Sequence, residues 1–340
     1  MDKEALLYER LDNNAVRCNL CSHRCKIAEH KFGFCGVREN IRGTLYTRVY
    51  GDLIAMHVDP VEKKPLYHFL PGSSSFSIAT IGCNFRCDFC QNWEISQRSF
   101  KGGEDFSSEE TSPQEIVSEA IKNNCQSISY TYTEPTVFFE YALDTAKLAK
   151  EKGLRNIFVT NGYMTKECLE IIRPYLDAAN VDLKFFREES YRRLCKGSLK
   201  PVLDSIRLMK EIGIWVEITT LVVPKENDSP EELKEIADFI FGIDKNIPWH
   251  VSRFHPDYKF NQAPPTAEAT LKMAQETGFQ AGLNFVYAGN VYGWGNDTFC
   301  PGCKKLLIKR KTFNIFEYNI KQDKCFFCGM PLAGIFNKEL

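Results

Sequence analysis

The chain has 340 residues, of which 44% are hydrophobic and 26% charged, which is typical of a globular protein with a large core. Its net charge of -1 and the lack of a long basic stretch argue against a nucleic-acid partner. The charged N-terminus has no apolar signal-peptide core, and no run of about 18 apolar residues occurs, so we expect no membrane span and a cytoplasmic location.

Cysteine is the residue that departs from ordinary composition, with 14 copies in the chain. Disulfides are rare in a reducing cytosol, and clustered cysteines in such a chain usually bind metal. Eleven of the cysteines fall into three clusters. The clusters divide the chain into an N-terminal extension (1–73), a middle domain (74–290) and a C-terminal segment (291–340).

The N-terminal extension has few clear helical patterns and ends in a turn-rich stretch at residues 71–75. Its cysteines are Cys18, Cys21, Cys25 and Cys35. Four thiolates can hold a zinc ion or an iron–sulfur cluster, and the pattern leaves both open. His23 lies within the set and can replace a cysteine as a ligand.

The middle domain alternates strand-like and helix-like segments. Strands are expected at residues 75–81, 127–132, 156–160, 180–185, 215–223, 249–254 and 283–287. Helices are expected to start after Ser112 and Ser229, which have the residues of helix caps, and to span residues 136–150, 165–175, 201–212 and 266–277. Gly278 is expected to stop the last helix. This alternation predicts an α/β fold with a parallel sheet, either open or closed into a barrel.

Polar or unusual residues stand where the predicted strands end. These residues are Cys83, Glu134, Asn161, Lys184, His255 and Asn290. In open parallel sheets and in barrels alike, the functional site lies at the C-terminal ends of the strands. We therefore expect these side chains to share one site.

Cys83, Cys87 and Cys90 form a Cys-x3-Cys-x2-Cys motif directly after the first predicted strand. A fully ligated [4Fe-4S] cluster takes four cysteines, so three leave one iron open, as catalytic metal sites do. A zinc ion that takes a fourth ligand from elsewhere is one alternative, and three unrelated buried cysteines are another. The position after a strand and the aromatic Phe89 favour the cluster.

The C-terminal segment carries two Cys-x2-Cys pairs separated by short strand-like stretches such as residues 312–318. The pairs consist of Cys300, Cys303, Cys325 and Cys328. This pattern is typical of a zinc ribbon, in which a closed four-thiolate site stabilises a segment with little core. The pattern leaves open whether ligands mix between the two ends of the chain. The three cysteines outside all clusters, Cys125, Cys168 and Cys195, are expected to be buried apolar residues.

The central motif, from Gly82 to Asn92, resembles the signature of radical S-adenosylmethionine (SAM) enzymes. The resemblance implies a partial (β/α)6-type TIM-like barrel, a [4Fe-4S] cluster on the three cysteines, and SAM chelated to the open iron. In such enzymes, one electron cleaves SAM to a 5′-deoxyadenosyl radical, which removes a hydrogen atom from the substrate.

Further matches in the middle domain resemble the strand ends of glycyl-radical activating enzymes. Glu134 stands where radical SAM proteins contact the SAM amino group, and Asp182 and Lys184 match the region around the SAM carboxylate. The resemblance assigns cofactor binding to Phe89, Asn92, Glu134, Asn161, Asp182, Lys184, His255 and Asn290. A structural alternative stays open, because Asp182 and Lys184 are also typical of an ion-paired rim, and Asn161 and His255 of turn residues.

The layout of all three cysteine clusters resembles the radical SAM proteins of the AmmeMemoRadiSam system, which are similar to pyruvate formate-lyase activating enzymes. The resemblance implies Memo-like or AMMECR-like proteins as partners, and we expect an electron donor such as flavodoxin or ferredoxin. We therefore expect a radical SAM oxidoreductase that acts on a protein partner. A small-molecule substrate and a non-catalytic metal-binding scaffold remain as alternatives.

Overall fold

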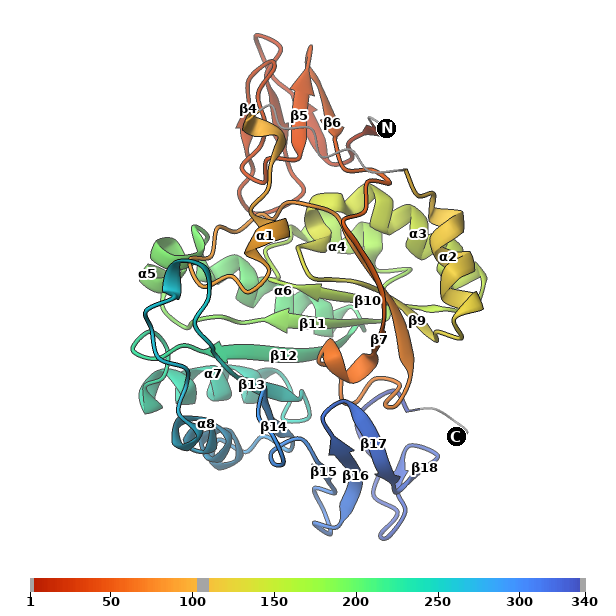
Figure 1. Ribbon diagram of the computed structural model, residues 1–340, viewed down its shortest axis with the longest axis vertical. Helices are drawn as coiled ribbons and strands as arrows, with labels where there is room; N and C mark the ends of the chain where they lie inside the picture. The colour runs from red at the N-terminus through yellow and green to blue at the C-terminus, as the bar shows by residue number, and fades with distance from the viewer. Residues whose placement is uncertain (1–2, 103–109, 337–340) are drawn as a thin grey trace.

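An eight-stranded sheet forms the centre of the computed structural model, which describes residues 3–102 and 110–336. Most of the N-terminal extension lies at one end of the molecule and the C-terminal segment at the other (Figure 1). The outermost residues of these two predicted regions, 1–2 and 337–340, lie outside the described residues.

Seven of the strands are parallel and follow one another in the sheet in chain order. They are β8 (Ser74–Ala79), β9 (Ser127–Tyr130), β10 (Arg155–Thr160), β11 (Ala178–Asp182), β12 (Trp215–Val222), β13 (Trp249–Arg253) and β14 (Val286–Gly289). The seven predicted strands are thus confirmed, with shifts of a few residues at their ends. Within the described residues the sheet is open, with β14 at one edge, and it does not close into a full barrel, which agrees with the predicted partial barrel.

A helix connects each parallel strand to the next, which gives the six predicted strand–helix units. The connecting helices are α2 (Pro113–Lys122), α3 (Phe139–Glu151), α4 (Lys166–Ile172), α6 (Leu199–Glu211), α7 (Pro230–Ile243) and α8 (Glu268–Gln280). Shorter turns are α1 (Trp93–Ser96), α5 (Glu188–Ser190), η1 (Val61–Lys63), η2 (Phe100–Gly102), η3 (Pro135–Phe138), η4 (Tyr191–Cys195) and η5 (Tyr258–Phe260). No helix in the described part of the chain combines the length and apolar character needed to cross a membrane.

The two predicted cap sequences start helices as expected. The Ser112 hydroxyl accepts a hydrogen bond from the backbone N–H of Glu115, whose carboxylate in turn accepts from the N–H of Ser112. Ser229 accepts from the N–H of Glu232 in the same way. These side chains satisfy N–H groups that have no partner within the helix, and they fix where each helix begins.

The prediction that Gly278 stops the last helix is wrong, because α8 continues to Gln280. A Cβ atom on Gly278 would lie 2.8 Å from Cγ2 of Val286 and 3.0 Å from Cε3 of Trp249. Glycine at this position therefore allows close packing of the helix on the sheet. Gly282, with a φ of +99°, follows the helix end.

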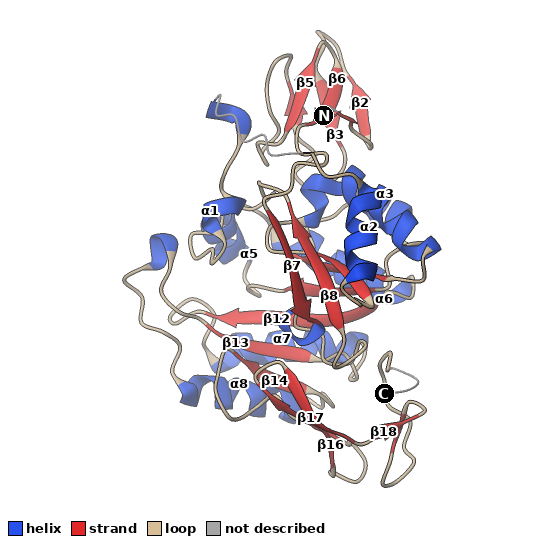
Figure 2. Cartoon of the chain, turned by 45° about the vertical axis from the view of Figure 1, so that its right-hand side comes forward, coloured by secondary structure: helices blue, strands red, loops and turns tan. Residues whose placement is uncertain are grey.

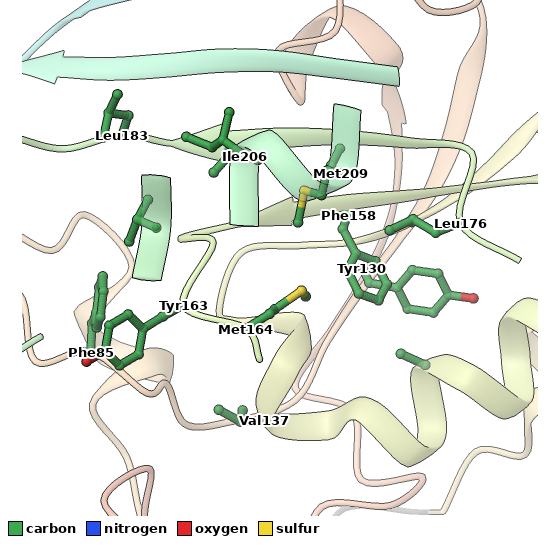
Figure 3. Close-up of a cluster of buried hydrophobic side chains, with 14 of the residues drawn as sticks. Phe85, Tyr130, Val137, Phe158, Tyr163, Met164, Leu176, Leu183, Ile206 and Met209 are labelled. Atoms are coloured by element: carbon green, nitrogen blue, oxygen red, sulfur yellow. The ribbon is translucent and has the colours of Figure 1, made fainter. Parts of the chain in front are cut away.

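The main core lies between the sheet and the covering helices (Figure 3). Tyr130 of β9 and Phe158 of β10 pack edge to face, with ring centroids 5.4 Å apart. Ile206 and Met209 bring the buried face of α6 to the same core. This core holds the strand ends in fixed positions relative to one another.

The N-terminal extension forms two small antiparallel sheets and contains few helical residues, as predicted. One consists of β1 (Lys3–Glu4), β6 (Thr44–Thr47) and β5 (Arg38–Ile41), and the other of β2 (Tyr8–Arg10), β3 (Val16–Cys18) and β4 (Lys26–Ile27). One strand of the extension, β7 (Ala55–Pro60), instead pairs antiparallel with β8 and forms the other edge of the central sheet (Figure 2). The expected division between residues 73 and 74 therefore falls in the connection between two paired strands.

The C-terminal segment folds around a small core of its own. Its strands are β15 (Thr298–Phe299), β16 (Leu306–Lys311), β17 (Asn314–Tyr318), β18 (Ile320–Lys321) and β19 (Lys324–Cys325). It is docked to the rest of the protein by Arg310, whose Nη2 donates to the carbonyl oxygen of Tyr67 over 2.9 Å.

Candidate active site and metal centres

The C-terminal ends of the parallel strands surround a cavity of about 500 Å³. A cavity of this size accommodates a ligand as large as a nucleoside derivative. The predicted site residues that line it are Cys83, Cys87, Phe89, Cys90, Asn92, Glu134, Asn161, Asp182 and Lys184. Most of the site predicted from strand ends is therefore gathered in one place.

The motif loop begins at Gly82, whose φ of +91° favours glycine and whose Cβ would lie 2.6 Å from Cγ1 of Val37. Two backbone hydrogen bonds join the loop to η4. The N–H of Arg86 donates to the carbonyl of Cys195 over 2.9 Å, and the N–H of Asp88 donates to that of Leu194 over 3.0 Å. These contacts fix the loop against η4.

The three motif thiols are grouped less tightly than the C-terminal cysteines. In the described part of the chain, their sulfur atoms do not all lie within 4.8 Å of one another, whereas those of the C-terminal cysteines do. Burial raises the pKa of Cys83 well above its ordinary value, and it also raises that of Cys90. Ligands bind metals as thiolates, so loading this site must release protons.

Glu134 is buried, and its carboxylate organises the ends of two strands. Oε1 accepts from the Thr136 hydroxyl over 2.5 Å and from the Thr160 hydroxyl over 2.8 Å, and Oε2 accepts from the N–H of Asn161 over 2.8 Å. Asn161 in turn donates to Oδ1 of Asn84 over 2.7 Å. Burial raises the pKa of Glu134, although these hydrogen bonds oppose the rise. The arrangement ties the cavity wall to the residue that follows Cys83.

Asp182 and Lys184 form an ion pair, with 2.8 Å between Oδ2 and Nζ. Burial by itself would lower the pKa of Lys184, but Asp182 and Cys87 raise it well above its ordinary value. Lys184 is therefore a fixed positive charge on the cavity wall. Such a charge favours an anionic group or a negatively charged cluster in the cavity.

The other predicted cofactor residues fall into two groups. Phe89 is buried and packs edge to face on Phe185, with ring centroids 5.5 Å apart, and Asn92 donates to the carbonyl of Tyr132 over 2.8 Å. His255 and Asn290 are exposed and lie outside the lining of the cavity. His255 is nevertheless connected to the cavity, because its Nδ1 lies 3.0 Å from Nε2 of Gln91, which lines it.

The structure places three further residues at the site that the sequence patterns missed. The Cys195 thiol lies close to that of Cys87, and this interaction, together with burial, raises the pKa of Cys87 well above its ordinary value. Cys195 is buried, as expected, but it also touches a motif thiol. Tyr132 and Lys64 line the cavity and share Asp59 as a partner, with Lys64 Nζ 2.7 Å from Oδ2. Tyr132 stands two residues before Glu134 in the sequence, whereas no local motif marks Lys64, which lies in the N-terminal extension.

The four C-terminal thiols form a compact candidate metal site. Their sulfur atoms all lie within 4.8 Å of one another, with 3.6 Å between Cys300 and Cys328 and 3.7 Å between Cys303 and Cys325. A tetrahedral zinc ion with Zn–S bonds of about 2.3 Å needs sulfur atoms roughly 3.8 Å apart. The residues therefore fit one tetrahedral ion.

The N-terminal thiols of Cys18, Cys21, Cys25 and Cys35 line one small apolar cavity. His23 lies outside this lining, and its Nε2 is 2.7 Å from the carbonyl oxygen of Asn84. The two terminal cysteine sets lie at opposite ends of the molecule (Figure 1), so they do not share ligands.

Comparison with known proteins gives a consistent family. The family model for the radical SAM superfamily matches residues 77–240. An uncharacterized protein of Methanocaldococcus jannaschii is 46% identical over 331 residues, which cover 96% of this chain and 98% of that protein. The pyruvate formate-lyase-activating enzyme of Clostridium pasteurianum is 24% identical over 190 residues, covering 53% of this chain and 77% of the enzyme.

The fold is also similar to that of SuiB from Streptococcus suis, which has been solved with S-adenosylmethionine bound and with its precursor peptide SuiA bound. The SAM complex has a TM-score of 0.51 at 16% identity, over 69% of this chain and 56% of SuiB. The peptide complex has a TM-score of 0.50 at 17% identity, over 68% of this chain and 51% of SuiB. On the matched domain and its activating-enzyme relatives, the chain belongs to the radical SAM superfamily of enzymes.

Proposed function

We propose that this enzyme binds a [4Fe-4S] cluster through Cys83, Cys87 and Cys90, binds SAM in the adjoining cavity, and abstracts a hydrogen atom from a protein partner. The observation that carries the proposal is the cavity, in which the three thiols meet Glu134, Asn161, Asp182 and Lys184. When bound, the cluster and SAM supply the 5′-deoxyadenosyl radical.

The residues of the chain then bind SAM, orient it and shield it from water. The Glu134 carboxylate has a free lone pair on Oε2 and is suited to the SAM amino group, while Lys184 is suited to its carboxylate. Phe89 closes the apolar side of the motif loop. For His255 and Asn290, we propose contacts with the adenosyl part of SAM at the rim of the cavity.

A protein substrate is supported by the relatives of the chain. The pyruvate formate-lyase-activating enzyme is named for its action on another enzyme, and SuiB is solved with a precursor peptide. Memo-like and AMMECR-like proteins are the first partners to test, since the cysteine layout resembles that of radical SAM proteins associated with them. A flavodoxin or a ferredoxin is the proposed electron donor.

We propose that the C-terminal cysteines hold a structural zinc ion, supported by their sulfur spacing of 3.6 and 3.7 Å. We also propose three functional regions, with residues 1–73 and 291–340 as metal-binding extensions of the catalytic domain at 74–290. The ion at the C-terminal end would hold together a segment that has only a small core.

The first test is 5′-deoxyadenosine formation from SAM by anaerobically reconstituted, dithionite-reduced protein. The wild type should form this product, and Cys87→Ala should not, because one cluster ligand is lost. Cys125→Ala is the matched control, since Cys125 is also buried but lies outside both cysteine-lined cavities. Turnover by Cys87→Ala would refute the assignment of the cluster ligands.

A second experiment separates a protein substrate from a small molecule. The reduced enzyme is incubated with SAM and each candidate partner, and the partner is then examined by mass spectrometry and electron paramagnetic resonance (EPR). A modified residue or a protein radical that requires SAM and Cys87 supports the proposal. Product formation that is stimulated only by a low-molecular-weight cell fraction would instead favour a small-molecule substrate.

A further inference from the structure

The N-terminal extension folds so that its four cysteines converge on one cavity. The N–H of Cys18, at the end of β3, donates to the carbonyl of Cys25 over 2.9 Å and brings these residues together. A turn between Cys21 and Arg24, closed by a hydrogen bond of 3.0 Å, places Cys21 beside them. The rest of the wall is mostly apolar, and its polar members are Arg38, Asn84 and Thr136.

The spacing of these thiols differs from that of the C-terminal set. Within the described residues, no three of the N-terminal sulfur atoms lie within 4.8 Å of one another. The same is true of the motif thiols of Cys83, Cys87 and Cys90. The C-terminal set is thus spaced for a single ion, whereas the N-terminal set and the motif set are not.

Arg38 gives a second, independent indication of an occupant. Its side chain is 2% exposed and lines the same cavity, and Nη2 is bonded to the Glu140 carboxylate. Its Nε and Nη1 have no partner among the described residues. A buried donor without a partner costs about 1–3 kcal/mol, so Arg38 is suited to acceptors within the cavity. The thiolates and sulfides of a negatively charged cluster are such acceptors.

The N-terminal cavity shares a thin wall with the SAM cavity. Cys83 lines the larger cavity and its neighbour Asn84 lines the smaller one. Likewise, Glu134 lines the larger cavity and Thr136 the smaller one, and hydrogen bonds join these two residues. His23, from within the N-terminal set, contacts the carbonyl oxygen of Asn84.

Arg86 closes this interface from the motif side. Its Nη2 donates to the carbonyl oxygens of Phe34 and Cys35 over 3.1 and 3.2 Å. Only one layer of residues therefore separates the two sets of thiols.

We infer that the N-terminal cysteines bind a second iron–sulfur cluster, which passes electrons to the cluster on the motif loop. This inference rests on the proposed function, because the second cluster supplies the electron that SAM cleavage consumes. A low-potential one-electron donor of the ferredoxin or flavodoxin class reduces the N-terminal cluster by one electron. That cluster is reoxidised when the same electron reduces the catalytic cluster, and no bond or proton is transferred.

Metal content is the first test, on the full chain reconstituted anaerobically with iron and sulfide. Two [4Fe-4S] clusters give about eight irons per chain, and one gives about four. We expect more than four irons in the wild type and about four in Cys21→Ser/Cys25→Ser. If this double variant does not fold, the triple variant Cys83→Ala/Cys87→Ala/Cys90→Ala still answers the question. It should retain iron and show an EPR signal on reduction that comes from the N-terminal cysteines alone.

The relay itself is tested by the source of electrons. Dithionite can reduce the catalytic cluster directly, whereas a protein donor is expected to act through the N-terminal cluster. In Cys21→Ser/Cys25→Ser, the ratio of donor-driven to dithionite-driven 5′-deoxyadenosine formation should fall by about tenfold or more. An unchanged ratio would show that the second cluster is not a relay.

The two proposals fail in different ways. About four irons with two zinc ions in the wild type, and no iron in the triple variant, would overturn the second cluster. Radical SAM chemistry would stand in that case if the wild type still formed 5′-deoxyadenosine. Turnover that persists in Cys87→Ala would instead overturn the proposed function itself.

Discussion

Replacing Glu134 by glutamine tests how the cavity wall is built. Glutamine has the same shape but replaces one carboxylate oxygen with an NH2 group. If the glutamine carbonyl accepts from the hydroxyls of Thr136 and Thr160, its NH2 must face the N–H of Asn161. In the wild type, that N–H donates to Oε2 of Glu134 over 2.8 Å. A hydrogen bond to a charged group is worth about 1.5–3 kcal/mol, and here a contact between two donors replaces it.

Neutralising a buried carboxylate recovers part of this loss, since burial raises the pKa of Glu134. We therefore expect Glu134→Gln to lower the free energy of unfolding by about 2 kcal/mol. If the carboxylate also binds the SAM amino group, the dissociation constant of SAM should rise by about 30-fold, the equivalent of about 2 kcal/mol. Urea unfolding measures the first quantity, and equilibrium dialysis with labelled SAM on the reconstituted protein measures the second.

Thr136→Val is the matched control, because it removes one donor to the same carboxylate but retains the charge and the Asn161 contact. It should cost about 1 kcal/mol of stability and weaken SAM binding far less than Glu134→Gln does. Equal SAM dissociation constants for Glu134→Gln and the wild type, at equal iron content, would refute the assigned role of the carboxylate.

Three further predictions concern the scaffold. Cys300→Ser should release zinc and lower the unfolding free energy through loss of a ligand, as measured by metal analysis and urea unfolding; retained zinc and unchanged stability would contradict a structural ion. Burial lowers the pKa of His68 to about 4, so its contribution to stability is complete above pH 6.5 and is lost as the pH falls toward 4. Between pH 7 and 5, His68→Asn should therefore lose about 2 kcal/mol less stability than the wild type in urea unfolding, and parallel pH profiles would refute this. Gly278→Ala should lower the free energy of unfolding by about 1–3 kcal/mol through overpacking. The control is Gly242→Ala in α7, whose Cβ would meet nothing within 4 Å and which should raise the free energy of unfolding by about 0.5–1 kcal/mol. Equal thermal midpoints for the two variants would contradict the packing argument.

The sequence by itself determined the order of strands and helices and the position of the active site in that order. These features follow from local signals, such as the cap of Ser112 and the apolar periodicity of each segment, which depend on residues a few positions apart. Parallel pairing then brings the carboxyl ends of the strands to one edge, so residues as distant as Cys83 and Lys184 were expected to meet.

Gly278 shows where such local reasoning fails. The same residue can end a helix or allow two elements to pack closely, and only the position of Trp249 and Val286 decides between these roles. The sequence likewise could not place Lys64 at the cavity, because this residue reaches the site from the connection between β7 and β8 and not from a strand-end motif.

The tertiary structure alone decided how the cysteine sets relate to one another. Spacing along the chain permits zinc or a cluster at either end, since both take four thiolates. The distances between sulfur atoms are set by the packing of separate segments, which brings the C-terminal thiols to 3.6 and 3.7 Å and leaves the N-terminal ones wider. The contact of the N-terminal set with Asn84 joins residues more than 60 positions apart, and such long-range contacts leave no mark in local sequence patterns.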